Sequence, residues 1–140
     1  MLKNVFGKKG DSGMGEGSEG DLQPFFESQF VQAFKIGAVI DVRIETETVT
    51  DRESRVLTDE IAQVAQEGSG RVTLDMSKVE MLASAGIGTL VQTHKKIKDG
   101  GGKFAIYGMN DDLMNLMKLT RMHKLFTITD SRESAISAVS

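Results

Sequence analysis

Apolar residues after Pro24 follow two spacings that alternate along the chain. Short runs rich in β-branched and aromatic residues predict strands, at residues 30–34, 39–44, 71–75, 103–107 and 126–128. Apolar residues that recur at helical spacing predict helices, at residues 51–66, 84–99, 111–120 and 132–139. The resulting order, β-β-α-β-α-β-α-β-α, favours an α/β fold. We expect a mostly parallel sheet that carries about four helices and has an antiparallel hairpin at its N-terminal end.

The first 24 residues have a different pattern. Six of the 15 glycines fall within the first 20 residues, where they alternate with serine and with charges of both signs. Such a stretch buries too little apolar surface to offset the entropy of ordering it. We therefore expect a disordered glycine-rich tail over residues 1–24 and one folded domain over residues 25–140, which is an ordinary size for a single domain.

Composition argues against several classes of function. Lys plus Arg is 17 and Asp plus Glu is 20, a net charge of −3, so no general positive field draws nucleic acid. The absence of cysteine excludes disulfides, thiolate zinc sites and cysteine nucleophiles. The longest stretch without charged residues or histidine is the 13 residues 81–93, below the roughly 20 that a membrane helix needs. We expect a cytoplasmic protein that neither binds nucleic acid directly nor inserts into a membrane.

The two histidines, His94 and His123, are 29 positions apart and are expected on the surface rather than in a metal site. His94 adjoins Lys95, Lys96 and Lys98, and we interpret this cluster as the solvated end of a helix, where positive charge suits the helix dipole. No metal or cofactor is predicted.

Candidate chemistry lies in the segment after the strand 71–75, because ligands and partners of open α/β sheets meet the C-terminal strand ends. Ser84 stands where the loop of this segment begins the helix 84–99. Two interpretations remain open. Serine is a favoured N-cap. It is also a phosphoacceptor, and a phosphate at a helix N-terminus is tolerated by its own domain but repels a docked partner.

This segment resembles the signature of the STAS domain, the family of anti-sigma factor antagonists. Leu74-Asp75-Met76-Ser77 is similar to the family's Leu-Asp-Leu-Ser, and Ala83-Ser84-Ala85-Gly86-Ile87-Gly88 to its Asp-Ser-Ser-Gly-Leu-Gly. The resemblance covers about residues 30–139, including the glycine run before residues 103–107. It implies a STAS-like domain over residues 25–140, with the strand and helix order predicted above.

The resemblance also implies a function. In this family a kinase of the histidine-kinase-like ATPase class, which is itself the anti-sigma factor, phosphorylates the first serine of the motif. The unmodified antagonist binds that kinase, and a serine phosphatase restores the complex. By position the phosphoacceptor is Ser84. We expect the partner surface to consist of the residues around it and two methionines of the helix 111–120, since methionine suits adaptable interfaces: Met81, Leu82, Ala83, Ala85, Gly86, Ile87, Met114 and Met117.

Three alternatives to this function differ in how far the residues support them. A constitutive STAS adaptor of a transporter or signalling scaffold, without phosphorylation, is favoured by the alanines on both sides of Ser84. A receiver domain with Asp75 as phosphoacceptor lacks the acidic pair and the lysine that such domains need, so Asp75 is interpreted as a capping or loop-orienting residue. An enzyme is not expected, because no catalytic motif is present and His94 lies roughly 15 Å along the helix from Ser84.

Overall fold

A computed structural model describes residues 22–140 of the chain. Its main sheet has six strands in the order β1-β2-β3-β5-β7-β8. These strands are Phe26–Glu27, Val31–Ile36, Val39–Ile44, Arg71–Asp75, Lys103–Tyr107 and Thr127–Thr129. The pairs β1–β2 and β2–β3 are antiparallel, and the pairs from β3 to β8 are parallel. The expected α/β fold, with its N-terminal hairpin and mostly parallel sheet, is confirmed.

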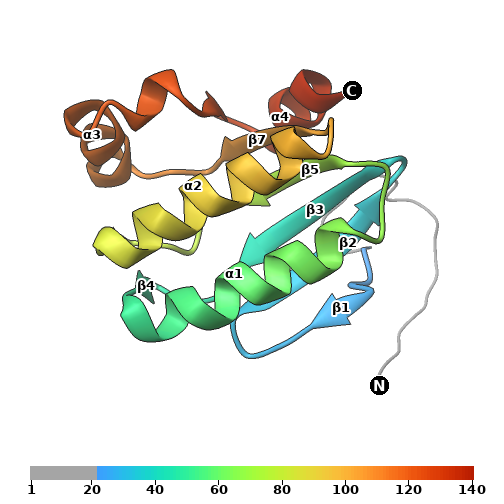
Figure 1. Cartoon of the computed structure of the whole chain (residues 1–140), viewed down its shortest axis with the longest axis horizontal. Helices are drawn as coiled ribbons and strands as arrows, with labels where there is room; N and C mark the ends of the chain where they lie inside the picture. Colours follow the sequence, from blue (N-terminus) through green and yellow to red (C-terminus); the bar gives the residue numbers. More distant parts are fainter. Residues whose placement is uncertain (1–21) are drawn as a thin grey trace.

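Within residues 22–140, four α-helices flank the sheet: α1 (Asp51–Ala65), α2 (Ser84–Asp99), α3 (Asp111–Leu119) and α4 (Arg132–Val139). Helices α1 and α2 run side by side over one face, whereas α4 packs on the other face against β5, β7 and β8 (Figure 1). Helix α3 and the 3-10 turn η3 (Met122–Lys124) lie beyond α2 toward one end of the molecule (Figure 1). This layering follows from the crossovers, because each parallel connection must carry a helix across a face of the sheet.

The main core lies between the sheet and the α1/α2 layer. Successive side chains of β3 point to opposite faces of the sheet, so Ile40 belongs to this core and Val39 to the cluster under α4. The smaller cluster joins Val39 to Ala105, Tyr107, Ala135 and Val139. A strand with apolar residues on both faces is typical of the centre of a parallel sheet.

The same α4 face contains a buried polar network around the Asp41 carboxylate. Asp41 is 3% exposed, and it accepts hydrogen bonds from the Thr73 hydroxyl at 2.7 Å and from the Tyr107 hydroxyl at 3.0 Å. Burial raises the pKa of Asp41 above its usual value, although the two hydroxyl donors oppose that change. The polar network occupies neighbouring strands β3, β5 and β7, so it ties the centre of the sheet together beneath α4.

Most predicted elements have the predicted bounds, and two strands are displaced. The structure has β2 at Val31–Ile36, not at 30–34, because Gly37 adopts a φ of 60° and lets Ile36 pair directly with Val39 across a two-residue turn. Strand β8 begins at Thr127, since Phe126 before it packs into the core. Of the predicted tail, residues 1–21 lie outside the described residues.

Candidate functional site

The loop after β5 leaves the sheet in a fixed orientation. The Asp75 carboxylate accepts a hydrogen bond from the Ser77 backbone N–H at 2.8 Å, and the Met76 N–H donates to the Tyr107 carbonyl at 2.9 Å. Gly108 lies so close that an added Cβ would stand 3.0 Å from the Ser77 nitrogen. The interpretation of Asp75 as a loop-orienting residue is therefore confirmed.

Two further strands, each of two residues, hold the far end of this loop. Strand β4 (Thr48–Val49) pairs in parallel with β6 (Met81–Leu82). The Glu47 carbonyl accepts from the N–H groups of Glu80 and Met81, and the Val49 carbonyl accepts from Ala83 at 2.9 Å. Backbone groups make all these bonds, so no side-chain pattern could have revealed the pair. It places the loop directly against the start of α1.

Helix α2 begins without a side-chain cap. The structure places Ala83 at the N-cap and Ser84 at the first helical position, so the N-cap interpretation of Ser84 is wrong. The other α-helices have polar side chains at their starts: Glu53 bonds back to Thr50 in α1, and the caps Asn110 and Ser131 accept from the backbone in α3 and α4. An alanine at this position leaves the first N–H groups of α2 unsatisfied by any side chain.

Ser84 is exposed, and its hydroxyl has no hydrogen-bond partner among residues 22–140. Within the same described part of the chain, the backbone N–H groups of Ser84 and Ala85 also bond to no protein acceptor. The first N–H groups used are those of Gly86 and Ile87, which reach the Ala83 carbonyl at 2.9 and 3.2 Å. An accessible hydroxyl thus stands beside two free donors at the positive end of a helix.

The residues predicted to bind a partner divide into two groups. Met81 is 55% exposed, and Ala83, Ala85, Ile87 and Met114 are half-buried. Leu82 and Gly86 are both buried. Gly86 is closely packed, since an added Cβ there would lie 2.8 Å from the Leu82 side chain and 3.1 Å from the Val49 carbonyl. These two residues support the surface from within and do not form it.

Met117 is the clearest correction to the predicted partner surface. It is 0% exposed and belongs to the main core with Leu113, which lies one turn earlier on the same face of α3. Met114 is half-buried on the neighbouring face of α3, and this helix packs against β6, the strand that contains Met81. Its helical spacing from Leu113 accounts for the burial of Met117, and the adaptability of methionine was not evidence of exposure.

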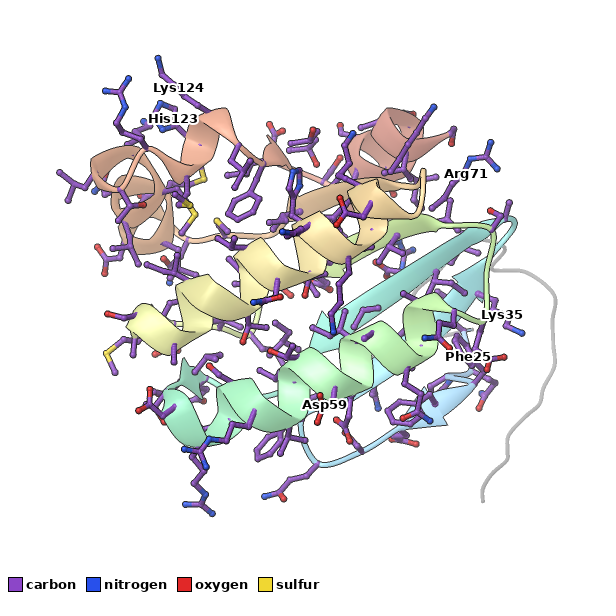
Figure 2. All side chains as sticks on the ribbon, in the orientation of Figure 1. Phe25, Lys35, Asp59, Arg71, His123 and Lys124 are labelled. Carbon is purple, nitrogen blue, oxygen red and sulfur yellow. The ribbon has the colours of Figure 1, made fainter. Side chains whose placement is uncertain are left out.

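A polar groove that the sequence did not reveal lies on the other side of Ser84, between the N-terminal halves of α1 and α2. Its volume is about 650 Å³. Ser54, Thr58 and Thr89 form its floor, where the Thr58 and Thr89 hydroxyls are 3.0 Å apart. The rim carries charges of both signs: Asp51, Arg55 and Asp59, the last labelled on α1 in Figure 2. Ser84 therefore separates an apolar surface at Met81 from a polar groove.

The histidines have different environments. His123 is exposed on η3, beside Lys124 (Figure 2). His94 is half-buried, with its ring edge-on to Phe126 at 5.6 Å between centroids, so its expected surface placement is wrong. Burial, with a contribution from Lys98, lowers the pKa of His94 below its usual value. Within residues 22–140 no cluster of histidine and carboxylate side chains could hold a metal ion.

Comparisons with known proteins agree on a single fold. The protein named "Putative anti-sigma factor antagonist BtrV", from Bordetella bronchiseptica, is 22% identical over 90 residues, which cover 64% of this chain and 78% of BtrV. The crystal structure of a putative anti-sigma factor antagonist from Thermotoga maritima superposes with a TM-score of 0.69 at 21% identity, over 78% of this chain and 93% of the other. SpoIIAA, a Bacillus cell fate determinant in its phosphorylated form, superposes with a TM-score of 0.59 at 11% identity, over 79% and 99%.

The family assignment rests on the sequence as well as on the fold. A family model of the STAS domain matches residues 31–135, which span the sheet from β2 and reach into α4. In the described part of the chain, no helix is both long enough and apolar enough to cross a membrane. The matched segment contains the loop-to-helix site at Ser84 and most of the sheet that supports it, and the chain belongs to the STAS domain family.

Proposed function

We propose that this protein is an anti-sigma factor antagonist whose binding to its partner is switched by phosphorylation of Ser84. The main support for the proposal is that Ser84, the first residue of α2, has an exposed hydroxyl at a helix N-terminus that no side chain caps. The similarity to BtrV and to the phosphorylated SpoIIAA supports the proposal. The partners we propose are a kinase of the histidine-kinase-like ATPase class, acting as the anti-sigma factor, and a serine phosphatase.

The physical basis of the switch is a difference between the domain and its partner. A phosphate brings about −1.5 to −2 charges and strong acceptor oxygens. On the domain these are stabilised by the positive end of α2 and by the free N–H groups of Ser84 and Ala85. On a partner that covers Met81 and Ile87, the same charge would have to be desolvated in an interface with apolar contacts. Phosphorylation should therefore release the partner and leave the fold intact.

The test is incubation of the full chain with ATP and the cognate kinase, followed by mass spectrometry. We expect one phosphate, at Ser84, and none in Ser84→Ala. Ser84→Asp should weaken kinase binding at least about tenfold, whereas Ser84→Ala should bind and not be released by ATP. Ser137→Asp is the matched control, because Ser137 is an exposed helical serine on α4, on the opposite face of the sheet. Persistent absence of phosphate from Ser84 would rule out the switch.

A constitutive STAS adaptor is the second candidate, because Ala83 and Ala85 leave Ser84 without a polar neighbour to orient its hydroxyl. An adaptor that uses the same surface without modification predicts a different pattern. Ser84 would remain unphosphorylated, and a partner recovered with the wild-type chain would be retained through rounds of ATP treatment. Truncation of Met81 to alanine should weaken binding under either function, so only the phosphate distinguishes the two.

A further inference from the structure

A second cavity lies at the opposite end of the α1 and α2 pair from Ser84. Its volume is about 370 Å³, within the range of small-molecule sites. We call it the α1/α2 cavity. It is lined by the C-terminal halves of both helices, by the turns that follow them and by strand β5, including Ile61, Ala62, Ala65, Val72, Thr93 and Ile97. Thr93 is nine residues along α2 from Ser84, or about 14 Å, so this cavity is separate from the partner surface.

The interior of the α1/α2 cavity is mostly apolar, with polar groups from Thr58, Gln66, Ser69 and Thr93, and small side chains keep it open. Ile61 and Val72 are 0% exposed and form its floor as members of the main core. On the walls, Ala62 and Ala65 face a helix that contributes Thr93 and Ile97. A leucine at either alanine would fill space that is at present empty. The cavity therefore results from side-chain size at the α1/α2 interface, and an apolar group could enter it without moving the helices.

Two glycine turns that line the cavity are joined through their backbones. The Gly70 carbonyl accepts from the Lys103 N–H at 2.9 Å, and Gly70 has a φ of 86°. A Cβ on Gly102 would collide with the Gly70 carbonyl oxygen and lie 2.9 Å from the Ile97 side chain. These turns cannot approach each other further, and the cavity cannot collapse by their movement. A preformed cavity binds a ligand without a cost of reorganisation.

Among the residues that the structure describes, Lys96 is the one charged residue that lines the cavity, and no carboxylate does. Among residues 22–140, Lys96 makes no ion pair. The last carbonyls of the helices are already used: those of Val64 and Ala65 accept from the turn after α1, and those of Lys96 and Ile97 from the turn after α2. The cavity thus offers an ammonium group to an anion and no unpaired carboxylate to a cation.

We propose that the α1/α2 cavity binds a small amphiphilic anion, an alkyl carboxylate whose chain lies between Ile61, Ala65 and Ile97 and whose carboxylate meets Lys96. The chain gains from leaving water for an apolar interior. The charged head remains at the open side with the lysine, where water still reaches both. The site does not depend on phosphorylation of Ser84, and it can exist whether or not the proposed function is correct.

The test is a titration of the ¹⁵N-labelled full chain with sodium octanoate, followed by amide chemical shifts. We expect saturable shifts confined to residues 58–72 and 93–102. Octanol should bind more weakly than octanoate, and octylamine more weakly still. Shifts that never saturate or that spread over the whole surface would overturn the proposal, as would tighter binding of octylamine than of octanoate.

Variants separate the two parts of the site. Ala62→Leu should abolish the saturable shifts by filling the cavity, with circular dichroism to verify the fold. Lys96→Gln should weaken octanoate about three- to fivefold and leave octanol unchanged, and this variant keeps the test valid if Ala62→Leu fails to fold. Lys95→Gln is the matched control, because Lys95 is exposed on the same helix and does not line the cavity. Equal weakening by both lysine variants would contradict the proposed contact.

Discussion

At one end of the α1 and α2 pair, α2 starts from an alanine cap, its first N–H groups are free, and the surface carries an accessible serine. At the other end the same two helices finish in glycine turns whose carbonyls and N–H groups are paired, around a cavity that those turns keep open. The first end can accept an added charge or a partner because its polar groups are unused. At the second end the backbone groups are already paired, and only a ligand that fits between the side chains can bind.

The largest loss of stability is expected from a substitution at Gly102, in the glycine turns. Gly102→Ala should lower the free energy of unfolding by about 3 kcal/mol, since its Cβ meets the backbone of Gly70, which has no rotamer with which to move aside. Urea denaturation measures this. Gly88→Ala is the control: nothing lies within 4 Å of a Cβ there, so this exposed helical position should gain about 0.5–1 kcal/mol. A cost below 1 kcal/mol at Gly102 would mean that the turns are not rigid.

A somewhat smaller effect is expected at the other end of the pair. Gly86→Ala should cost about 2 kcal/mol, because its Cβ would lie 2.8 Å from the Leu82 side chain, which can shift, and 3.1 Å from the Val49 carbonyl, which cannot. The measurement is again urea denaturation. If Gly86→Ala proves as costly as Gly102→Ala, the two ends are equally rigid and the contrast between them fails.

The missing cap predicts a gain. Ala83→Asp should stabilise the protein by about 1 kcal/mol, because its carboxylate would accept from the first N–H groups of α2. Ala83→Asn distinguishes a hydrogen bond from a charge effect, since only the former survives in the amide. Ser84→Ala should change stability by less than about 0.5 kcal/mol, and a loss near 1 kcal/mol would restore serine as a capping residue.

The smallest effect concerns His94, midway along α2. Its folded-state pKa is lowered, first by burial and then by Lys98, so the folded state resists protonation. The stability that depends on neutral His94 is fully present above the unfolded pKa of about 6.5 and is lost as the pH falls through and below that value. In thermal melts between about pH 7.5 and 5, the melting temperature should decline as the pH falls. The decline should be shallower in Lys98→Gln, and the part of it that His94 causes should be absent in His94→Gln. An unchanged slope in His94→Gln would show that other groups cause the decline.

Sequence patterns predicted the long elements well and the short ones poorly. The strands at 39–44, 71–75 and 103–107 and the helix at 84–99 have the predicted bounds, because each has a clear period and a polar or glycine boundary. The pair β4–β6 was missed, since strands of two residues have no period and are held by the backbone of residues 47–49. That pair is what places the Ser84 loop.

The exposure of the candidate site residues was predicted only in part. The structure leaves Ser84 and Met81 exposed and Met114 half-buried, and their roles stay predictions. Met117 and His94 were misplaced because each lies on a helix where a shift of one residue separates buried from exposed positions. The polar groove and the α1/α2 cavity could not be predicted, since each is a space between two helices that are distant in sequence.

The amino-acid sequence alone determined the order of strands and helices, the STAS family and the position of the candidate phosphoacceptor, because local periodicity and a contiguous motif carry that information. Tertiary structure decided which residue occupies the N-cap position of α2, which methionine is buried and where the helices leave space. Those features depend on the register of α1 against α2 and on backbone contacts such as that of Gly70 with Lys103, which have no local signature in the chain.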